Sequence, residues 1–227
     1  MKDIFSDYLE INKLVKNILD SPDRGGNISI KTGSDIIIKP SGIDLKSDIV
    51  KITQVNEQKT YSIIGNEIRN IAYLKPSMEL GFHKVLPSKY VLHYHPLYIL
   101  RFLCGDAECL ANIGDIVEYY HPGSCDLIDA ISNTSKHIIF LKNHGVIIHS
   151  DTIEEIKQLY GVLREFNIFK DFMQNYTPDS CLIHSDEINL FNYVLKSFKC
   201  NELSDSDKIK LLSDENEIYR KSVKWIL

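Results

Sequence analysis

The segment YVLHYHP, residues 90–96, is the stretch from which the fold of this 227-residue chain is most directly predicted. Its β-branched and aromatic residues predict a strand that ends before Pro96, since proline cannot donate to a sheet ladder. Side chains alternate along a strand, so His93 and His95 leave one face and Tyr94 leaves the other. The two imidazoles are therefore either polar side chains on a half-buried face or two ligands of one metal ion.

A third histidine stands in a turn between two further predicted strands. These strands cover His137–Leu141 and Gly145–His149, and His144 precedes the second. Alone it is a histidine in a turn. Together with His93 and His95 it makes a set of three histidines with an open position, which is the arrangement of catalytic zinc sites. The other histidines show no comparable spacing and are predicted to be structural or surface residues: His83, His121, His137, His149 and His184.

Glu79 is a candidate partner of the three histidines. A glutamate in a loop is normally a solvated surface charge. If its loop folds over the histidines, Glu79 becomes a fourth ligand at rest or a proton carrier for a bound substrate.

The remaining hydrophobic pattern predicts one α/β domain with a mostly antiparallel sheet and helices at both ends. Helices are expected at 3–20, at Glu79–Leu86, at 124–131, at 152–173 with Thr152 and Glu155 as a capping box, and at 186–199 and 206–225 in the tail. Further strands are expected at Asn27–Lys31, Asp35–Lys39, Ile49–Thr53, Thr60–Ile64, Tyr90–His95 and Ile116–Tyr120.

Composition and charge exclude several classes of protein. The chain is 44% apolar with a formal charge of −5, so no basic surface for nucleic acid or for an anionic membrane is expected. The start of the chain lacks a secretory pattern, and the apolar stretch 90–103 is too short and too polar to span a bilayer. Five cysteines without a CxxC pair support neither a disulfide framework nor a thiolate zinc cage. We expect a cytoplasmic protein whose metal ligands are histidine and carboxylate.

Two glycine-containing turns are candidates for anion binding. They are GGNIS at 25–29 and KPSG at 39–42. Backbone N–H groups and small polar side chains in such turns can cradle an anion, although each turn alone is more typical of an ordinary hairpin turn.

Taken in order, these segments resemble the class II aldolase/adducin family over roughly residues 5 to 180. The resemblance rests on GGNIS at 25–29, KPSGI at 39–43, PSMELGFH at 76–83, HYHP at 93–96, YYHPGSCDL at 119–127 and NHGVI at 143–147. It implies a single α/β/α layered domain with a central, mostly antiparallel sheet. We expect this domain to cover residues 1–180, with 181–227 as a C-terminal helical extension packed on it.

The resemblance also implies a zinc-dependent lyase that acts on a small sugar phosphate or sugar-acid phosphate through an enediolate. Aldol cleavage is the first expectation, with decarboxylation, dehydration or a non-catalytic, adducin-like binding role as alternatives. Residue by residue it implies zinc ligands at His93, His95 and His144, an acid/base residue at Glu79, and a phosphate cradle at Gly26, Asn27, Ser41, Gly42 and Ser77. The family's enzymes are typically homotetramers, so a homo-oligomer is expected.

Two departures from the family pattern concern the substrate. Met78 stands where the aldolases have a second serine of the phosphate cradle, and Lys39 or Lys75 are candidates to compensate. No tyrosine between His95 and His144 aligns with the one that protonates the leaving aldehyde in fuculose-phosphate aldolase. The second proton donor is therefore unassigned.

Overall fold

A single nine-stranded sheet organises the computed structural model, which describes residues 2–17, 20–21, 24–166, 203–213 and 215. The strands are β1 (Asn27–Thr32), β2 (Asp35–Ile38), β3 (Val50–Gln54), β4 (Lys59–Ile64), β5 (Glu67–Ile71), β6 (Tyr90–Tyr94), β7 (Asp115–Val117), β8 (Ile138–Leu141) and β9 (Gly145–Ser150). Their order is β5-β4-β3-β2-β1-β6-β9-β8-β7. Every neighbouring pair is antiparallel except β7 and β8, so the predicted mostly antiparallel sheet is confirmed.

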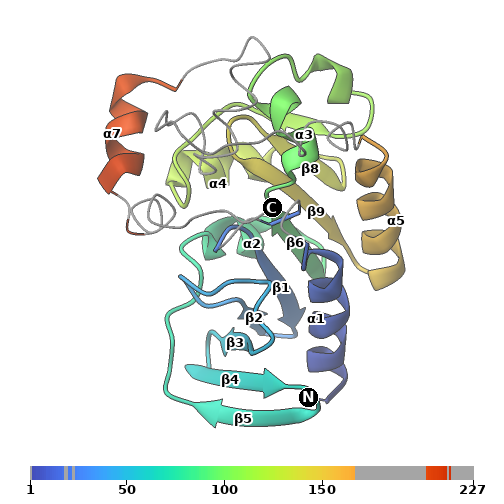
Figure 1. Ribbon diagram of the computed structural model, residues 1–227, viewed down its shortest axis with the longest axis vertical. Helices are drawn as coiled ribbons and strands as arrows, with labels where there is room; N and C mark the ends of the chain where they lie inside the picture. The colour runs from blue at the N-terminus through green and yellow to red at the C-terminus, as the bar shows by residue number, and fades with distance from the viewer. Residues whose placement is uncertain (1, 18–19, 22–23, 167–202, 214, 216–227) are drawn as a thin grey trace.

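Helices cover both faces of this sheet (Figure 1). One layer holds α1 (Lys2–Leu14) and α5 (Ile153–Arg164), which contact each other and strands β1, β6 and β9. The other holds α2 (Leu80–Val85) and α4 (Cys125–Ser132), which also contact each other. The remaining elements are α3 (Leu97–Leu103), a 3-10 turn at Glu108–Leu110 and α7 (Asp205–Ser213). The α/β/α layering expected from the resemblance is confirmed.

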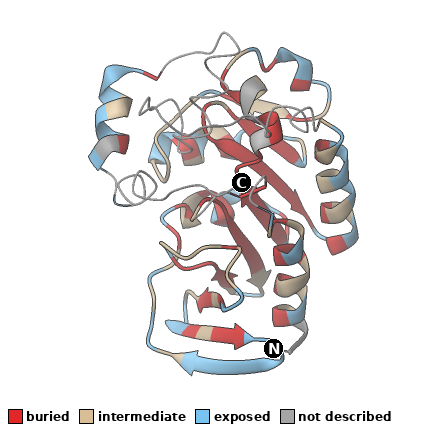
Figure 2. Ribbon diagram, in the orientation of Figure 1, coloured by how far each residue is buried: buried red, intermediate tan, exposed pale blue. Residues whose placement is uncertain are grey.

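The alternation along β6 divides its side chains between two hydrophobic cores. Leu92 and Tyr94 lie in the core under α1 and α5, whereas Val91 lies in the core under α2 and α4. Figure 2 shows β6, β8 and β9 buried along their lengths, and β1 is buried over its first four residues. His93 therefore faces the α2 side, because it is on the same face as Val91.

Two helices begin where their caps predict. Ser124 accepts a hydrogen bond from the backbone N–H of Leu127 at the start of α4, and Thr152 accepts one from that of Glu155 at the start of α5. The reciprocal half of the predicted capping box is wrong, because the Thr152 N–H donates to Ser150 Oγ instead. The Glu155 carboxylate binds Ser150 and His137.

Some predicted boundaries are also wrong. The first helix ends at Leu14, because the chain then turns to bring Asp20 within 3.1 Å of Arg164 on α5. Strand β7 stops at Val117 rather than at residue 120. The hydrophobic pattern predicts neither strand β5 nor helix α3; β5 is mostly exposed and polar, and α3 begins directly after Pro96, a position at which proline is favoured.

The tail is described only around α7. There Leu203 and Leu211 pack with Tyr119. The predicted helix at 186–199, the part of the long helix beyond 166 and most of the helix at 206–225 lie outside the described residues. The 180/181 boundary stays a prediction. Among the described helices, none has the length and apolar character needed to cross a bilayer.

Candidate metal centre

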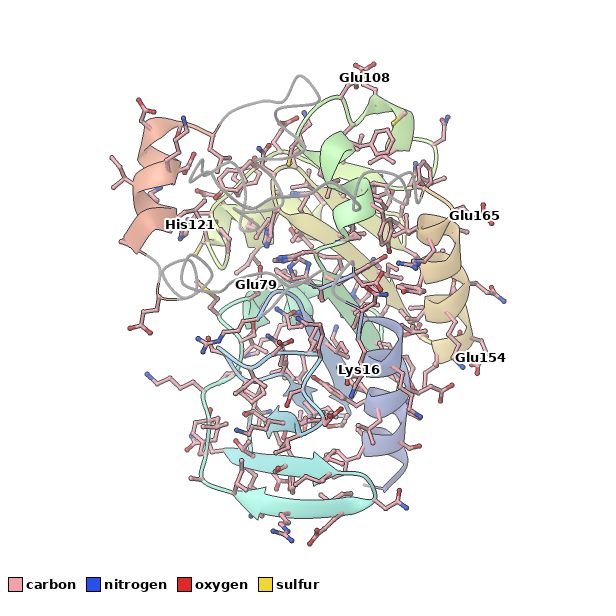
Figure 3. The ribbon with its side chains drawn as sticks, in the orientation of Figure 1. Lys16, Glu79, Glu108, His121, Glu154 and Glu165 are labelled. Atoms are coloured by element: carbon pink, nitrogen blue, oxygen red, sulfur yellow. The ribbon has the colours of Figure 1, made fainter. Side chains whose placement is uncertain are left out.

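Three histidines and one glutamate converge in the interior, on the α2 side of the sheet. His93 and His95 come from β6 and the residue after it, His144 from the turn before β9, and Glu79 from the residue that precedes α2. Figure 3 shows Glu79 in the middle of the molecule, whereas Glu108 and Glu154 lie at its periphery. The exposed fraction of Glu79 is 7%, and those of the three histidines are at most 3%.

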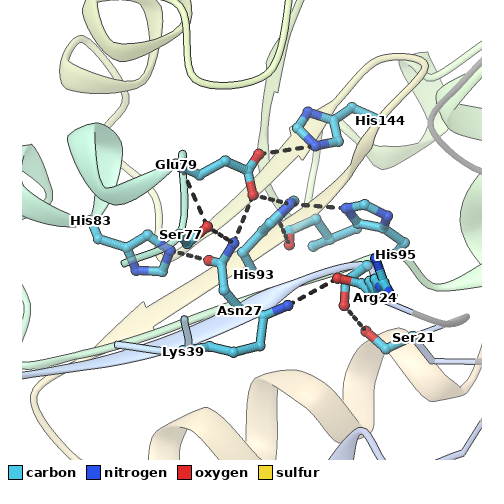
Figure 4. Close-up of polar contacts among 12 residues, drawn as sticks. Ser21, Arg24, Asn27, Lys39, Ser77, Glu79, His83, His93, His95 and His144 are labelled. Carbon is cyan, nitrogen blue, oxygen red and sulfur yellow. Dashed lines mark hydrogen bonds and ion pairs between the residues drawn. The ribbon is translucent and has the colours of Figure 1, made fainter. Parts of the chain in front are cut away.

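The ligand atoms of these residues lie close together (Figure 4). One nitrogen from each histidine lies within 4.8 Å of the others, and the two Nε2 atoms of His93 and His95 are 3.0 Å apart. The Glu79 carboxylate spans the group, with Oε2 3.4 Å from His93 Nε2 and Oε1 3.2 Å from His144 Nε2. The loop that carries Glu79 therefore does fold over the three histidines.

The backbone fixes the orientation of His93. Its Nδ1 lies 3.0 Å from the carbonyl oxygen of Val146 on the neighbouring strand β9. A carbonyl oxygen only accepts, so Nδ1 carries the proton and donates it. The Nε2 lone pair of neutral His93 is then directed at the cluster, which is the tautomer that a metal ligand needs.

Burial sets the charge state of the cluster. Burial lowers the pKa of His93 to about 4, so this imidazole is neutral at pH 7. Burial alone would raise the pKa of the Glu79 carboxyl, but the neighbouring His93, His144 and His95 hold it well below its usual range. A deprotonated carboxylate beside a neutral imidazole is the protonation state that binds a divalent cation.

The donor set fits zinc. Three imidazole nitrogens and one carboxylate oxygen match the ligand types of catalytic zinc sites. Oε1 of Glu79 is buried and makes no hydrogen bond of good geometry among the described residues; His144 Nε2 lies beside it at 3.2 Å. A cation at the cluster would satisfy this oxygen, as buried polar atoms normally are.

Gly145 is required by the close packing around the histidines. A Cβ atom at this position would lie 2.6 Å from the Tyr94 carbonyl oxygen and 2.7 Å from Cδ2 of His95. It would also lie 3.1 Å from Cε1 of His93. The strand-to-strand contact cannot widen without moving two candidate ligands.

The first prediction is that Gly145→Ala weakens zinc binding by about tenfold or more and destabilises the fold by about 1–3 kcal/mol. Competition with a chromophoric chelator and thermal unfolding measure the two effects. Gly161→Ala is the matched control, because a Cβ there meets nothing within 4 Å and the residue lies in α5. The control should bind zinc normally and unfold at an equal or higher temperature; normal zinc affinity in Gly145→Ala would contradict the packing argument.

The expected anion cradle is only partly assembled around the cluster. Asn27 donates from Nδ2 to Glu79 Oε2 at 2.7 Å and to Ser77 Oγ at 3.0 Å, so both residues adjoin the candidate metal ligands. Gly26 packs against the β6 backbone, where a Cβ would lie 2.6 Å from the His93 carbonyl oxygen. Ser41 and Gly42 lie in the loop after β2, where the Ser41 N–H donates to the Lys75 carbonyl oxygen.

The structure locates the ammonium group of Lys39. This side chain is only 4% exposed, and its Nζ donates to the carbonyl oxygens of Arg24 at 2.9 Å and Ile43 at 2.6 Å. These carbonyls flank the two glycine-containing turns. Lys39 therefore ties the turns together and places a positive charge beneath them.

His83, predicted to be a structural or surface residue, lies in the interior. It is fully buried on α2, and its ring nitrogens contact Ser29 and Asn27 on β1. Its imidazole is therefore one residue removed from Glu79 in a chain of hydrogen bonds. The only sequence signal was its place in the segment PSMELGFH, four positions after Glu79.

A family model describes most of this region. The model of the class II aldolase and adducin N-terminal domain matches residues 21–166. The chain belongs to this family. The match includes His93, His95, His144 and Glu79 as well as both glycine-containing turns, so the family assignment covers the candidate centre itself.

Individual proteins that are similar to this chain have low sequence identity to it. An L-fuculose phosphate aldolase of Methanococcus maripaludis is 29% identical over 186 residues, which cover 70% of this chain and 96% of the relative. A sugar-phosphate aldolase from Thermotoga maritima has a TM-score of 0.53 at 15% identity and covers 78% of this chain and 99% of its own. An L-fuculose-1-phosphate aldolase from Thermus thermophilus has a TM-score of 0.51 at 13% identity, with coverages of 77% and 98%. At these identities the two structures support the fold alone.

Proposed function

We propose that this chain is a zinc-dependent lyase that cleaves a carbon–carbon bond of a small sugar phosphate by a retro-aldol reaction. The observation that carries the proposal is the convergence of His93, His95, His144 and Glu79 in one buried cluster. Family membership and similarity to L-fuculose phosphate aldolases support an aldolase-type lyase. We propose in addition that the metal is zinc, that the substrate is a sugar phosphate and that the four residues have the roles given below.

The anionic state of Glu79 and the neutral state of His93 support a division of roles between them. His93, His95 and His144 would hold the metal through neutral nitrogens. A zinc ion held there supplies Lewis-acid stabilisation of the negative charge that develops on a substrate oxygen. Retro-aldol cleavage removes a hydroxyl proton, breaks the C–C bond and returns a proton to the carbon that keeps the electron pair. Glu79 is an anionic carboxylate beside this centre. We assign it to take up the hydroxyl proton and to return it to that carbon.

The substrate's anion would bind beside Asn27 and Ser77, between the two turns that Lys39 connects. Backbone N–H groups of Gly26 and Gly42 and the hydroxyl of Ser41 complete the proposed phosphate cradle. The buried ammonium of Lys39 favours an anion there electrostatically.

Met78 is the residue of this cradle that differs from the aldolases. Its side chain is 47% exposed and lies against the turn at Gly123. Met78→Ser is expected to lower KM for a phosphorylated substrate about three- to tenfold at unchanged kcat, because a hydroxyl adds a hydrogen bond of about 0.5–1.5 kcal/mol in ground and transition states alike. Steady-state kinetics with a phosphorylated and an unphosphorylated ketose measure the effect; an equal change for both would show that Met78 is remote from the phosphate.

The experiment that tests the proposed function is incubation of zinc-loaded protein with a panel of ketose phosphates. A coupled assay for dihydroxyacetone phosphate reports aldol cleavage. Release of carbon dioxide or of water from sugar-acid phosphates would instead indicate a decarboxylase or a dehydratase. Stoichiometric zinc without turnover of any substrate would favour a binding protein of the adducin type.

We also propose that the chain assembles as a homotetramer and acts in the cytoplasm. Light scattering on the eluting protein should give four times the chain mass of 26.1 kDa. A monomeric mass at micromolar concentration would contradict the tetramer.

A further inference from the structure

His83 connects the candidate centre to strand β1 through a chain of buried hydrogen bonds. Asn27 and Ser29 leave the same face of β1, and the imidazole of His83 lies between them. Its Nδ1 is 2.7 Å from Ser29 Oγ, and its Nε2 contacts Oδ1 of Asn27. The other end of the Asn27 amide faces Glu79 (Figure 4).

The donors and acceptors in this chain admit one arrangement of protons. The Asn27 nitrogen faces the carboxylate of Glu79, because the reverse orientation would place two oxygens together. The Asn27 oxygen then faces His83 and only accepts, so His83 Nε2 carries a proton. Burial lowers the pKa of His83 to about 3, so the ring is neutral at pH 7 and Nδ1 must accept from the Ser29 hydroxyl.

We infer that His83 is a positioning residue, which holds the Asn27 amide so that its nitrogen donates to Glu79 and directs that carboxylate toward His93 and His144. The inference deepens the proposed function and rests on it for the role of Glu79. Without the His83 donor, the Asn27 amide loses the partner that selects its orientation. The reversed amide would repel Glu79 from the metal ligands.

If the role of His83 were purely structural, a different result would be expected. His83 stacks with Phe82 and links α2 to β1 through its two hydrogen bonds, so any replacement changes stability. A structural residue would affect unfolding without a specific effect on zinc affinity or kcat. The partners of metal ligands, in contrast, typically contribute 10- to 100-fold to metal affinity or activity.

The test compares three variants. His83→Phe keeps the ring volume and removes both hydrogen bonds, whereas His83→Gln keeps a donor and an acceptor. His149→Phe is the matched control, because His149 is also buried and bonds a serine, Ser88, but lies outside the cluster. Zinc affinity by chelator competition, kcat and KM are measured for each variant that folds by circular dichroism.

We expect His83→Phe to bind zinc about tenfold more weakly and to lose about 10- to 100-fold in kcat with little change in KM. His83→Gln should recover most of both, and His149→Phe should match the wild type in both. Zinc affinity and kcat of His83→Phe within about twofold of the wild type would overturn the inference, as would an equal loss in His149→Phe.

Nitrogen-15 NMR of the histidine rings in the metal-free wild type gives a readout that needs neither activity nor a folded variant. A neutral His83 with its proton on Nε2 at pH 7 supports the inference, and a proton on Nδ1 overturns it. If the wild type cleaves no ketose phosphate, the proposed function fails, while zinc affinity and the NMR tautomer still decide whether His83 positions Glu79.

Discussion

Replacing Glu79 by glutamine is expected to lower kcat by about 10²- to 10⁴-fold, the usual contribution of a positioned general acid/base. Glutamine has nearly the same shape and still accepts from the Asn27 amide, so the fold should be retained. It cannot take up or release a proton at neutral pH. Three histidines remain for the metal, so the variant should still hold zinc at saturating concentrations.

The measurement is steady-state turnover of Glu79→Gln with the best substrate of the ketose phosphate panel, at saturating zinc. Glu154→Gln is the matched control, because Glu154 is exposed on α5 and remote from the cluster. The control should retain full kcat. Turnover of Glu79→Gln near the wild-type level would show that another group carries the proton.

His93→Ala is expected to abolish both zinc binding and turnover. His93 lies at the centre of the cluster, 3.0 Å from His95 Nε2 and 3.4 Å from the Glu79 carboxylate. Its removal takes one ligand from the middle of the cluster and leaves His95, His144 and Glu79 around a gap, so zinc should be lost at concentrations that saturate the wild type. Zinc at 100 times its dissociation constant should stabilise the wild type by about 2.7 kcal/mol and raise Tm by about 5–10 °C.

Thermal unfolding of wild type, His93→Ala and a control variant, each with and without zinc, measures this zinc-dependent stabilisation. His93→Ala should show no zinc-dependent rise in Tm, even if its metal-free Tm is lower than that of the wild type. His137→Ala is the control, because its side chain is 48% exposed and bonds Glu155 away from the cluster. An equal rise in all three proteins would place the zinc elsewhere.

The pairing of His93 with His95 could be predicted because it is local. Strand alternation alone puts both rings on one face of β6, and Tyr94 packs on the other face near Tyr160. The place of His144 beside them could not be derived from spacing. It depends on the antiparallel register of β6 and β9, which pairs His93 with Ile147, and only the resemblance to the family predicted it.

The His83 contacts show why the rest of the site could not be predicted. His83 and Asn27 are far apart in sequence, and neither position has a local pattern that points to the other. The family resemblance assigns Asn27 to phosphate binding, yet its amide nitrogen donates to Glu79 and Ser77. Hydrogen bonds of this kind arise from the packing of α2 on β1, which a hydrophobic pattern does not specify.

The same distinction holds for the fold. Strands β1 to β4 could be predicted because buried, β-branched residues run along them, as in the isoleucines of β2. Strand β5 has mainly exposed residues and is held by its pairing with β4, so its sequence carries a weak signal. Helix α3 follows Pro96, which ends β6 but also suits the start of a helix.

Equilibrium dialysis against zinc, followed by metal analysis of the protein, measures whether the buried cluster binds a metal ion. We expect one tightly bound zinc ion for each wild-type chain and none for His93→Ala under the same conditions. Wild-type protein that retains no zinc, or His93→Ala that retains as much as the wild type, would contradict a metal centre built from His93, His95, His144 and Glu79.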